Sequence, residues 1–243
     1  KFDSLDAALF HAEEMVNQGA DILDVGGEST RPGHIQITED EEIARVTPVI
    51  EQLKKRFDVP VSIDTYKSRV AEAALQSGAD LVNDIWGLKY DENMAEVIAR
   101  HQAACCLMQN REQIDYTDYV EDVLDDLRES VQIAKAADIP DDRIMLDPGV
   151  GFGKTYEMNL EIIRVVGRLK ELGYPVLLGT SRKSVIGLTL DLPADQREEG
   201  TLVTTVLGVE QGCSFVRVHD VETNARAIRM AEAIFREHDL AVR

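Results

Sequence analysis

The chain has 243 residues, a length that suits a single domain, and its 44% hydrophobic content is enough for a large core. It contains no run of about 18 apolar residues, so the sequence predicts no membrane-spanning helix. The formal net charge of −19 argues against nucleic acid or an anionic membrane as a partner, and an anionic substrate would need a local cluster of positive charge.

Apolar periodicity predicts helices and strands that alternate along the whole chain. Eight helices are expected near residues 4–18, 38–57, 67–78, 91–101, 118–137, 158–172, 194–211 and 221–237. Seven strands are expected near residues 22–25, 59–64, 81–85, 103–108, 143–146, 175–179 and 214–219. The second helix opens on Thr38-Glu39-Asp40-Glu41, which has the pattern of a capping box.

Repeated βα units of about 30 residues indicate a parallel sheet with crossover helices. We therefore expect residues 1–243 to form one α/β domain with the (β/α)8 TIM-barrel fold. That barrel has eight strands, each followed by its helix, whereas this chain begins with a helix and supplies seven strands. A further strand is expected before Lys1, with its place between the strands ending at Asp24 and His219. A doubly wound open sheet is the alternative, but no G-x-G-x-x-G follows the first strand.

Three cysteines, Cys105, Cys106 and Cys213, show neither metal-ligand nor redox spacing. Two of them are adjacent in an apolar run, so the simplest interpretation is that they are buried thiols of a cytoplasmic protein. The chain begins without an apolar signal segment, and its start without Met indicates a missing upstream piece.

Side chains suited to ligand contact stand at the ends of six of the seven expected strands. They are Asp24, Asp64, Asn83, Met108, Asp147, and Arg217 with His219. Each polar one has an ordinary explanation, because Asp and Asn at strand ends often cap the next helix or open a turn. In a barrel, however, all of these ends meet at one face, and that face holds the active site of barrel enzymes.

Asp147 is the most informative of these residues, because Pro148 and three glycines follow it before Lys154. Glycines permit positive φ and let the backbone come close to a flat ligand. A buried charge must be paired or hydrogen-bonded, so core packing alone gives no reason for Asp here. The alternative is a Gly-rich turn whose Asp caps the segment that follows.

The three carboxylates and the amide accept hydrogen bonds, whereas Arg217, His219 and the nearby Lys183 can donate them. This combination suits a ligand with an N–H edge at one end and a phosphate at the other. Arg217 and His219 lie two residues apart on one strand, so their side chains point to the same side. A surface ion pair is the alternative explanation for these two residues.

Seven segments spread in order over almost the whole chain resemble one known family. They are residues 24–33 (DVGGESTRPG), 62–65 (SIDT), 82–84 (VND), 107–108 (LM), 147–154 (DPGVGFGK), 179–184 (GTSRKS) and 217–220 (RVHD). Together they resemble the dihydropteroate synthase family. The resemblance implies a pterin-binding barrel that joins 6-hydroxymethyl-7,8-dihydropterin pyrophosphate to 4-aminobenzoate in folate synthesis, with 7,8-dihydropteroate and pyrophosphate as products.

The resemblance also implies roles for individual residues. It places the pterin against Asp64, Asn83, Met108, Asp147 and Lys183. It places the pyrophosphate against Arg217 and His219, and 4-aminobenzoate against Thr30, Arg31, Pro32 and Ser184. The catalytic set would be Asp64, Asp147, Lys183, Arg217 and His219. These residues would stabilise separating charge during C–O cleavage, with Mg²⁺ beside the leaving group, before the aniline nitrogen attacks. The resemblance further suggests a homodimer.

Several positions depart from the family pattern or are left without a ligand. The family's first strand, with a loop that carries a metal-binding Asn, is absent, so we expect that Asn upstream of Lys1. Gln109 stands where the family often has His, with little effect expected, and Val185 stands where it often has Phe, which would loosen the aminobenzoate wall. Glu28 and Lys154 are interpreted as structural residues with a loop ion pair as their role.

Two other functions fit part of the pattern. A methyltetrahydrofolate-dependent methyltransferase barrel would share the pterin carboxylates but has no use for Ser29–Pro32 or Ser181–Ser184. A paralogue could bind pterin without turnover, although the complete set of site residues argues against this. Release of pyrophosphate on mixing both substrates would separate the three functions.

Overall fold

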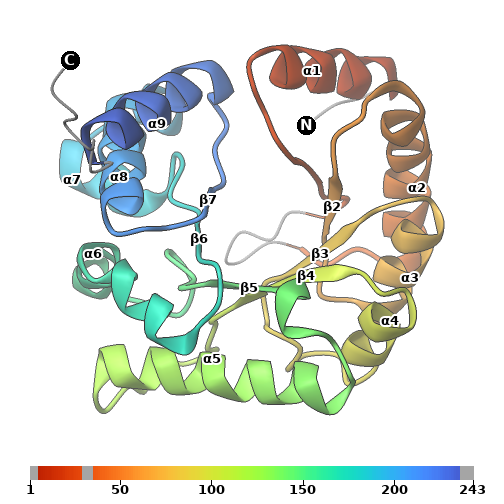
Figure 1. Ribbon diagram of the computed structural model, residues 1–243, viewed down its shortest axis with the longest axis horizontal. Coiled ribbons are helices and arrows are strands. Elements are labelled where there is room, and N and C mark those ends of the chain that lie inside the picture. Colours follow the sequence, from red (N-terminus) through yellow and green to blue (C-terminus); the bar gives the residue numbers. More distant parts are fainter. Residues whose placement is uncertain (1–4, 29–34, 236–243) are drawn as a thin grey trace, which may run out of the picture.

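The computed structural model describes residues 5–28 and 35–235 (Figure 1). Its α-helices are α1 (Leu5–Asn17), α2 (Glu39–Arg56), α3 (Ser68–Gln76), α4 (Met94–Arg100), α5 (Tyr119–Ala136), α6 (Tyr156–Arg164), α7 (Ser184–Leu190), α8 (Glu198–Glu210) and α9 (Val221–Phe235). Its strands are β1 (Leu23–Val25), β2 (Val61–Asp64), β3 (Leu81–Asp84), β4 (Ala104–Met108), β5 (Ile144–Asp147), β6 (Leu177–Leu178) and β7 (Phe215–Val216). Among the described helices, none combines the length and apolar composition needed to cross a bilayer.

The strands follow one another in chain order around a ring. Strands β1 to β5 form one parallel sheet in that order, and β6 pairs with β7 in parallel. A parallel bridge between Leu146 and Val176 connects the two sheets. The helices surround the strands in Figure 1. This is the α/β TIM-barrel architecture predicted from the sequence, and within the described residues β1 and β7 are not paired with each other.

Period-two alternation along the strands creates two cores. Side chains that point outward join the helices in one large cluster, to which Ile63, Val82 and Leu146 belong. Side chains that point inward form a small cluster inside the ring, built from Leu81, Cys106 and Met145 with Ala104, Leu177 and Phe215 against it. The next inward position along each strand, toward the carboxyl end, is where the polar residues stand. The inner cluster is therefore the floor of the polar site.

Most predicted elements are confirmed, and one helix differs for a visible reason. The expected helix 158–172 is split, because α6 ends at Arg164 and a 3-10 helix covers Val166–Leu172. At the break, the Gln211 side chain accepts a hydrogen bond from the Gly167 N–H at 3.0 Å and donates one to the Ile163 carbonyl at 3.0 Å. The Gln211 side-chain amide, at the end of α8, thus binds a backbone N–H and a backbone carbonyl that a continuous helix would pair with each other.

Sequence periodicity missed α7 and overestimated its neighbours. Helix α7 has only seven residues, with Gly187 in its middle, which is too short for a periodic signal. A Cβ atom at Gly187 would lie 2.1 Å from the Arg197 guanidinium, so a larger residue there would displace Arg197. The expected helix 194–211 begins instead with a 3-10 turn before α8, and strands β6 and β7 are two residues long rather than five or six.

The N-terminus of α2 follows the sequence prediction. Thr38 has extended backbone, and its Oγ1 accepts a hydrogen bond from the Glu41 N–H at 3.2 Å, which is the N-cap half of the predicted capping box, whereas the Glu41 carboxylate accepts from Arg45 Nη2 at 2.5 Å. Four residues separate the start of the helix from residues 29–34, which lie outside the described part of the chain.

Candidate active site

Four of the residues predicted for the pterin lie side by side at the carboxyl ends of neighbouring strands. Strand register pairs Asp64 with Asn83, and Met108 with Asp147. All four are buried, with 4% to 9% of their surface exposed. Parallel pairing brings them together because the strand ends share one face of the barrel.

Asp147 is held by the loop that follows it. Its Oδ1 accepts a hydrogen bond from the Gly149 N–H at 2.7 Å. Gly149 has φ of +70°, and a Cβ atom there would lie 1.9 Å from the Gln109 carbonyl oxygen. Burial raises the pKa of Asp147, an effect opposed by Lys183 and by the Gly149 hydrogen bond. Only glycine lets the backbone come this close to the Gln109 carbonyl while its N–H donates to the Asp147 carboxylate.

Lys183 approaches the same carboxylate from the N-terminus of α7. Its Nζ donates to the Val150 carbonyl and lies 4.9 Å from the centre of the Phe152 ring. Burial lowers the pKa of Lys183 to about 8, while Asp147 acts in the opposite direction. The Lys183 ammonium thus joins the Gly-rich loop to α7, and its pKa lies close to neutral pH.

Arg217 connects the two ends of the described ring. Its Nε donates to Asp24 Oδ2 at 2.7 Å, and its Nη2 donates to Asp64 Oδ2 at 3.2 Å. Burial, followed by the charge of Asp24, raises the pKa of Asp64 to about 7, although Arg217 lowers it. The Asp24 carboxylate raises the pKa of Arg217 further above its usual value. Arg217 therefore remains a cation beside a carboxyl group that is only about half ionised at neutral pH.

Two buried acceptor atoms in this cluster have no hydrogen-bond partner within the described residues. They are the Oδ1 atoms of Asp24 and Asp64. Unsatisfied buried acceptors are uncommon, and each represents an unfavourable desolvation that a donor or a cation would relieve. The Asn83 side-chain amide also makes no hydrogen bond inside the described part of the chain. This end of the site is built to receive donors.

His219 and Ser184 stand at the outer part of the site. The His219 Nδ1 is 2.9 Å from Ser181 Oγ, and this hydroxyl also accepts from the His219 N–H at 3.2 Å. Arg182, with φ of +58°, binds Asp220 through two hydrogen bonds of 2.6 and 3.2 Å. Ser184 is exposed at the first position of α7. Side-chain contacts, rather than a strand ladder, therefore fix the segment between β6 and α7.

The residues predicted for 4-aminobenzoate fall mostly outside the described part of the chain. Thr30, Arg31 and Pro32 belong to residues 29–34, and only Ser184 can be placed. Val185, the expected wall residue, is buried in the main hydrophobic core. The role of these residues stays a prediction.

A buried ionic cluster joins Glu28 to Ile37 and Glu42 through Lys67. Lys67 Nζ donates to Glu28 Oε2 at 2.6 Å, to Glu42 Oε2 at 2.8 Å and to the Ile37 carbonyl at 2.9 Å. Burial disfavours the ammonium, but hydrogen bonds to Glu28 and Glu42 outweigh this and raise the pKa of Lys67. The Tyr66 hydroxyl adds a 2.6 Å hydrogen bond to Glu28. The structural ion pair predicted for Glu28 is present, and its partner is Lys67.

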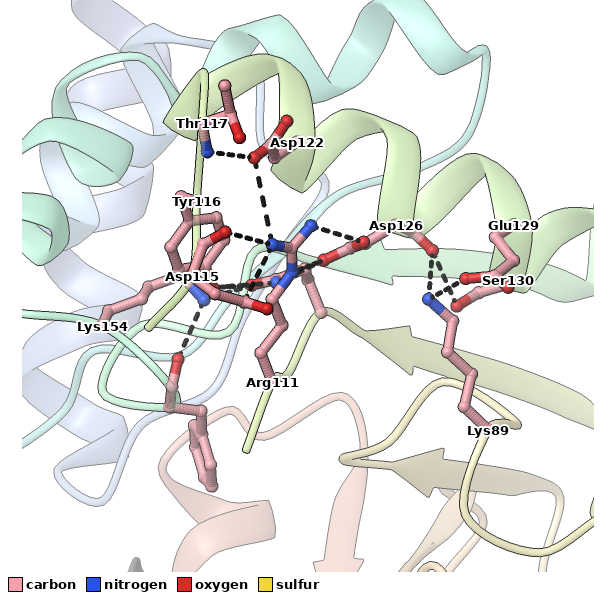
Figure 2. A network of polar contacts seen from close by, with 12 residues as sticks. Lys89, Arg111, Asp115, Tyr116, Thr117, Asp122, Asp126, Glu129, Ser130 and Lys154 are labelled. Atoms are coloured by element: carbon pink, nitrogen blue, oxygen red, sulfur yellow. Dashed lines mark hydrogen bonds and ion pairs between the residues drawn. The ribbon is translucent and has the colours of Figure 1, made fainter. Parts of the chain in front are cut away.

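The corresponding interpretation of Lys154 is wrong. Within the described residues it forms no ion pair, and its Nζ donates to Gln109 Oε1 and to the Phe152 carbonyl. Gln109 in turn donates to Asp126 Oδ2 at 2.8 Å and to the Tyr116 hydroxyl at 3.0 Å. Figure 2 shows Lys154 reaching the network in which Arg111 lies against Asp126 of α5. Gln109, expected to matter little, is 2% exposed and central to this network.

Three further residues join the site although no particular ligand was assigned to them. Asp24 was recognised as a strand end, and its partner Arg217 is 193 positions away, so no local signal shows the pair. Phe152 and Ser181 lie inside two of the family-like segments, where attention to every member of the motif would have found them.

The described residues contain no complete metal site of their own. No three His, Cys, Asp or Glu side chains among them come together as possible metal ligands. Mg²⁺ is usually held by one or two carboxylates together with substrate phosphates and water. The unpartnered oxygens of Asp24 and Asp64 fit such a shared site, and they do not form a complete site by themselves.

Comparisons with known proteins agree with this geometry. A family model described as pterin binding enzyme matches residues 1–219. The dihydropteroate synthase of Clostridium beijerinckii is 56% identical over 237 residues, which cover 97% of this chain and 88% of the relative. A solved dihydropteroate synthase from Clostridium difficile, in the presence of pteroic acid, is 52% identical with a TM-score of 0.95, covering 98% of this chain and 90% of that one. The Xanthomonas albilineans dihydropteroate synthase with 4-aminobenzoic acid is 37% identical with a TM-score of 0.91, covering 95% of this chain and 85% of that one.

Proposed function

This chain belongs to the dihydropteroate synthase family of folate biosynthesis, and from that premise we propose how its own residues perform the synthase reaction. The enzyme joins the methylene carbon of 6-hydroxymethyl-7,8-dihydropterin pyrophosphate to the amino nitrogen of 4-aminobenzoate. A C–O bond breaks, pyrophosphate leaves with the bonding electrons, and the aniline nitrogen supplies the new pair. The observation that carries the proposal is the row of buried acceptors, Asp64, Asn83 and Asp147, that faces the cations Lys183 and Arg217.

The pterin ring is proposed to lie against the row of strand ends. Asp147 can accept two adjacent N–H groups of the aminopyrimidinone edge, because charge-assisted paired hydrogen bonds are the strongest available to such an edge. Asn83 and Asp64 offer further acceptors, and the buried Met108 forms an apolar wall. Lys183 donates to the ring oxygen and N5 from the opposite side. These roles also place negative charge beside the cation that forms when the C–O bond breaks.

The pyrophosphate is proposed to bind Arg217 and His219. About 45% of the Arg217 side chain is exposed, so its remaining donors face outward while Asp24 and Asp64 hold it from behind. We include Mg²⁺ as a companion of the pyrophosphate, with the unpartnered oxygens of Asp24 and Asp64 as available hard ligands. When bound, Mg²⁺ would offset negative charge that develops on the leaving group.

The 4-aminobenzoate ring is proposed to sit beside Thr30, Arg31, Pro32 and Ser184, with the Phe152 ring as a neighbour of Lys183. Because the pterin pyrophosphate forms part of the wall for the second substrate, binding should be ordered. A sulfonamide that resembles 4-aminobenzoate should therefore bind tightly only after the pterin pyrophosphate is present. Tight binding to the empty protein, or inhibition that excess 4-aminobenzoate does not relieve, would contradict this arrangement.

A homodimer is proposed from the surface of the last three α-helices. Helix α8 carries Leu202, Val203 and Val206 on an outer helix whose buried residues are small, which indicates that its apolar surface is covered. Half of the twelve exposed large hydrophobic residues in the described part of the chain lie on α7, α8 and α9, namely Leu188, Leu190, Val203, Met230, Ile234 and Phe235. A second copy of the chain is the proposed partner, and sedimentation equilibrium measures the mass of the assembly.

A cytoplasmic location is proposed from the free thiols Cys105 and Cys106, which are both buried.

Two measurements test the proposed reaction and its pocket. Mixing the protein with both substrates should release pyrophosphate, and omission of either substrate should abolish the release. Asp147→Asn keeps the shape of the side chain but replaces one accepting oxygen by a donor that faces a ligand donor, so pterin affinity should fall by about 1–3 kcal/mol or more. Calorimetry with a pterin measures this loss, and unchanged affinity would remove Asp147 from the pterin site.

A further inference from the structure

A second lysine lies behind the pterin carboxylate without touching the proposed ligand positions. Lys154 Nζ is bound to Gln109 Oε1 and to the Phe152 carbonyl, and it lies 3.2 Å from the place where a Gly149 Cβ would be. Gly149 is the residue whose N–H holds Asp147. Lys154 is therefore one peptide away from the pterin carboxylate.

The Gln109 amide is polarised in one direction between a cation and an anion. Its oxygen accepts from Lys154, while its nitrogen donates at 2.8 Å to Asp126, which Arg111 binds at 2.7 and 3.0 Å. An amide has one accepting and one donating end, so these contacts fix its orientation. The network shown in Figure 2 consequently anchors Lys154 to α5, well outside the ligand pocket.

The same contacts determine the shape of the Gly-rich loop. Lys154 holds the Phe152 carbonyl, and the Phe152 ring lies against Lys183. A Cβ at Gly153 would lie 2.5 Å from the Arg111 carbonyl oxygen, so the loop is pressed directly against the segment that carries Gln109. A shift of Lys154 would therefore move Phe152, and with it the environment of Lys183.

We propose that Lys154 is a positioning residue of the synthase: through its contacts with Gln109 and the Phe152 carbonyl it holds the Gly-rich loop in place and keeps a positive charge behind Asp147. This inference rests on the proposed pterin pocket. Its chemistry is that of a buried ammonium supporting a buried carboxylate that must accept N–H groups.

The charges around these two groups come from several elements and set the expected pH dependence. Those that face Lys154 or Asp147 are Lys183 from α7, Arg217 beyond β7, Asp126 from α5 and Arg111 after β4. Burial lowers the pKa of Lys154 to about 7, so the ammonium is present below that pH and is lost above it. Its support of Asp147 therefore acts on the acidic side, where protonation of Asp147 would otherwise weaken pterin binding.

The test compares pterin affinity and kcat/KM for the pterin pyrophosphate across pH in Lys154→Met. The acid limb of both profiles should move to higher pH by about one unit, which corresponds to as much as a tenfold loss on that limb. The loss should be much smaller near pH 8.5, where the wild-type amine is already neutral. Lys55→Met, which removes an exposed lysine of α2, is the matched control and should leave both profiles unchanged.

Two substitutions at Gln109 keep the test valid if Lys154→Met folds poorly. Gln109→His offers one ring nitrogen to accept from Lys154 and one to donate to Asp126, so it should behave like the wild type. Gln109→Leu removes both functions at similar volume and should reproduce the shift of the acid limb. A Lys154→Met loss that is equal at all pH values and follows the drop in Tm would overturn the proposal, as would unaltered profiles.

The outcome for Asp147→Asn separates this inference from the proposed pocket. If Asp147→Asn leaves pterin affinity unchanged, the pocket itself is misassigned. If Asp147→Asn weakens binding while Lys154→Met leaves the acid limb in place, only the role of Lys154 fails.

Discussion

The two parts of the barrel place their functional groups in different ways. In the part from β1 to β5, the acceptors Asp64, Asn83 and Asp147 belong to strands, and neighbouring strands hold them in register. In the part from β6 to α9, strands are two residues long, and the cations Lys183 and Arg217 lie beyond them. The first part fixes acceptors through the backbone ladder, whereas the second fixes donors through side-chain contacts.

The difference follows from what each kind of group needs. Short Asp and Asn side chains have little reach, so only a well-placed backbone can aim their oxygens. Long Lys and Arg side chains can reach from a distance, but their freedom must be reduced by neighbouring contacts. Backbone substitutions should therefore be most damaging in the first part, and loss of supporting side chains should be most damaging to function in the second.

Gly149→Ala should give the largest effect, because it displaces the backbone that positions an acceptor of the first part. A Cβ atom would lie 1.9 Å from the Gln109 carbonyl oxygen, in addition to the strain of φ at +70°. We expect a loss of about 3 kcal/mol or more in the free energy of unfolding, together with loss of pterin binding. Urea unfolding and calorimetry measure the two effects.

Gly173→Ala is the matched control for that substitution. Gly173 also has positive φ, at +84°, but a Cβ atom there would have nothing within 4 Å. It should cost only about 1 kcal/mol, the strain of the left-handed conformation, and should leave pterin affinity intact. Equal losses in the two variants would show that the close approach to Gln109 is unimportant.

Arg197→Met should have a smaller effect on stability and a clear effect on activity, because it removes a support of the second part. Arg197 donates to the carbonyls of Arg182 at 2.9 Å and Lys183 at 3.2 Å, and to the Leu192 carbonyl at 2.9 Å. Without Arg197, the turn that positions Lys183 loses three hydrogen bonds to its carbonyl groups and those of its neighbours. We expect kcat/KM to fall by about 10-fold to 100-fold, since a displacement near 1 Å is enough for such a loss.

Arg164→Met provides the comparison, because the Arg164 side chain is 74% exposed and contacts only Glu161, at 3.8 Å, among the described residues. It should change neither kcat/KM nor Tm measurably. If Arg197→Met lowered Tm but left kcat/KM at the wild-type value, the position of Lys183 would not depend on this support.

Sequence reasoning succeeded where the fold is governed by periodicity and failed where it is governed by contacts between distant residues. The strands ending at Asp64 and Asp147 were predictable because apolar runs of that length, followed by a polar residue and a helix, define βα units. The pairing of Arg217 with Asp24 was not predictable, because it depends on the two ends of the ring meeting. Helix α7 was missed because seven residues carry no periodic signal.

Lys154 shows the same limit within the site. Its motif identified the loop, but the sequence could not show that its partner is Gln109, 45 positions earlier, rather than an acidic residue. A lysine beside a glycine loop suggests an ion pair, and the close approach of that loop to β4 gives it a neutral acceptor instead. The family-like segments thus indicated where chemistry happens, while the supporting contacts required the structure.

Asp64→Asn should have a modest effect on stability, of a size that depends on pH. Burial and Asp24 raise the pKa of Asp64 from 3.8 to about 7, so the folded protein holds a proton there that the unfolded chain has lost. Folding is therefore favoured by this group below pH 4, and the contribution disappears as the pH rises through about 7. Asn does not titrate, so the variant should be more stable than the wild type at pH 8 and no more stable at pH 4.

The gain in stability at pH 8 should be about 1–2 kcal/mol, less than the full pKa difference implies, because Arg217 loses one hydrogen bond to a charged partner. Thermal unfolding of the ligand-free protein at both pH values measures it. A variant that is less stable than the wild type at pH 8 would show that Arg217 stabilises the Asp64 carboxylate more than burial opposes it, and the acceptors of the first part would then be fixed by charge as well as by the strand ladder.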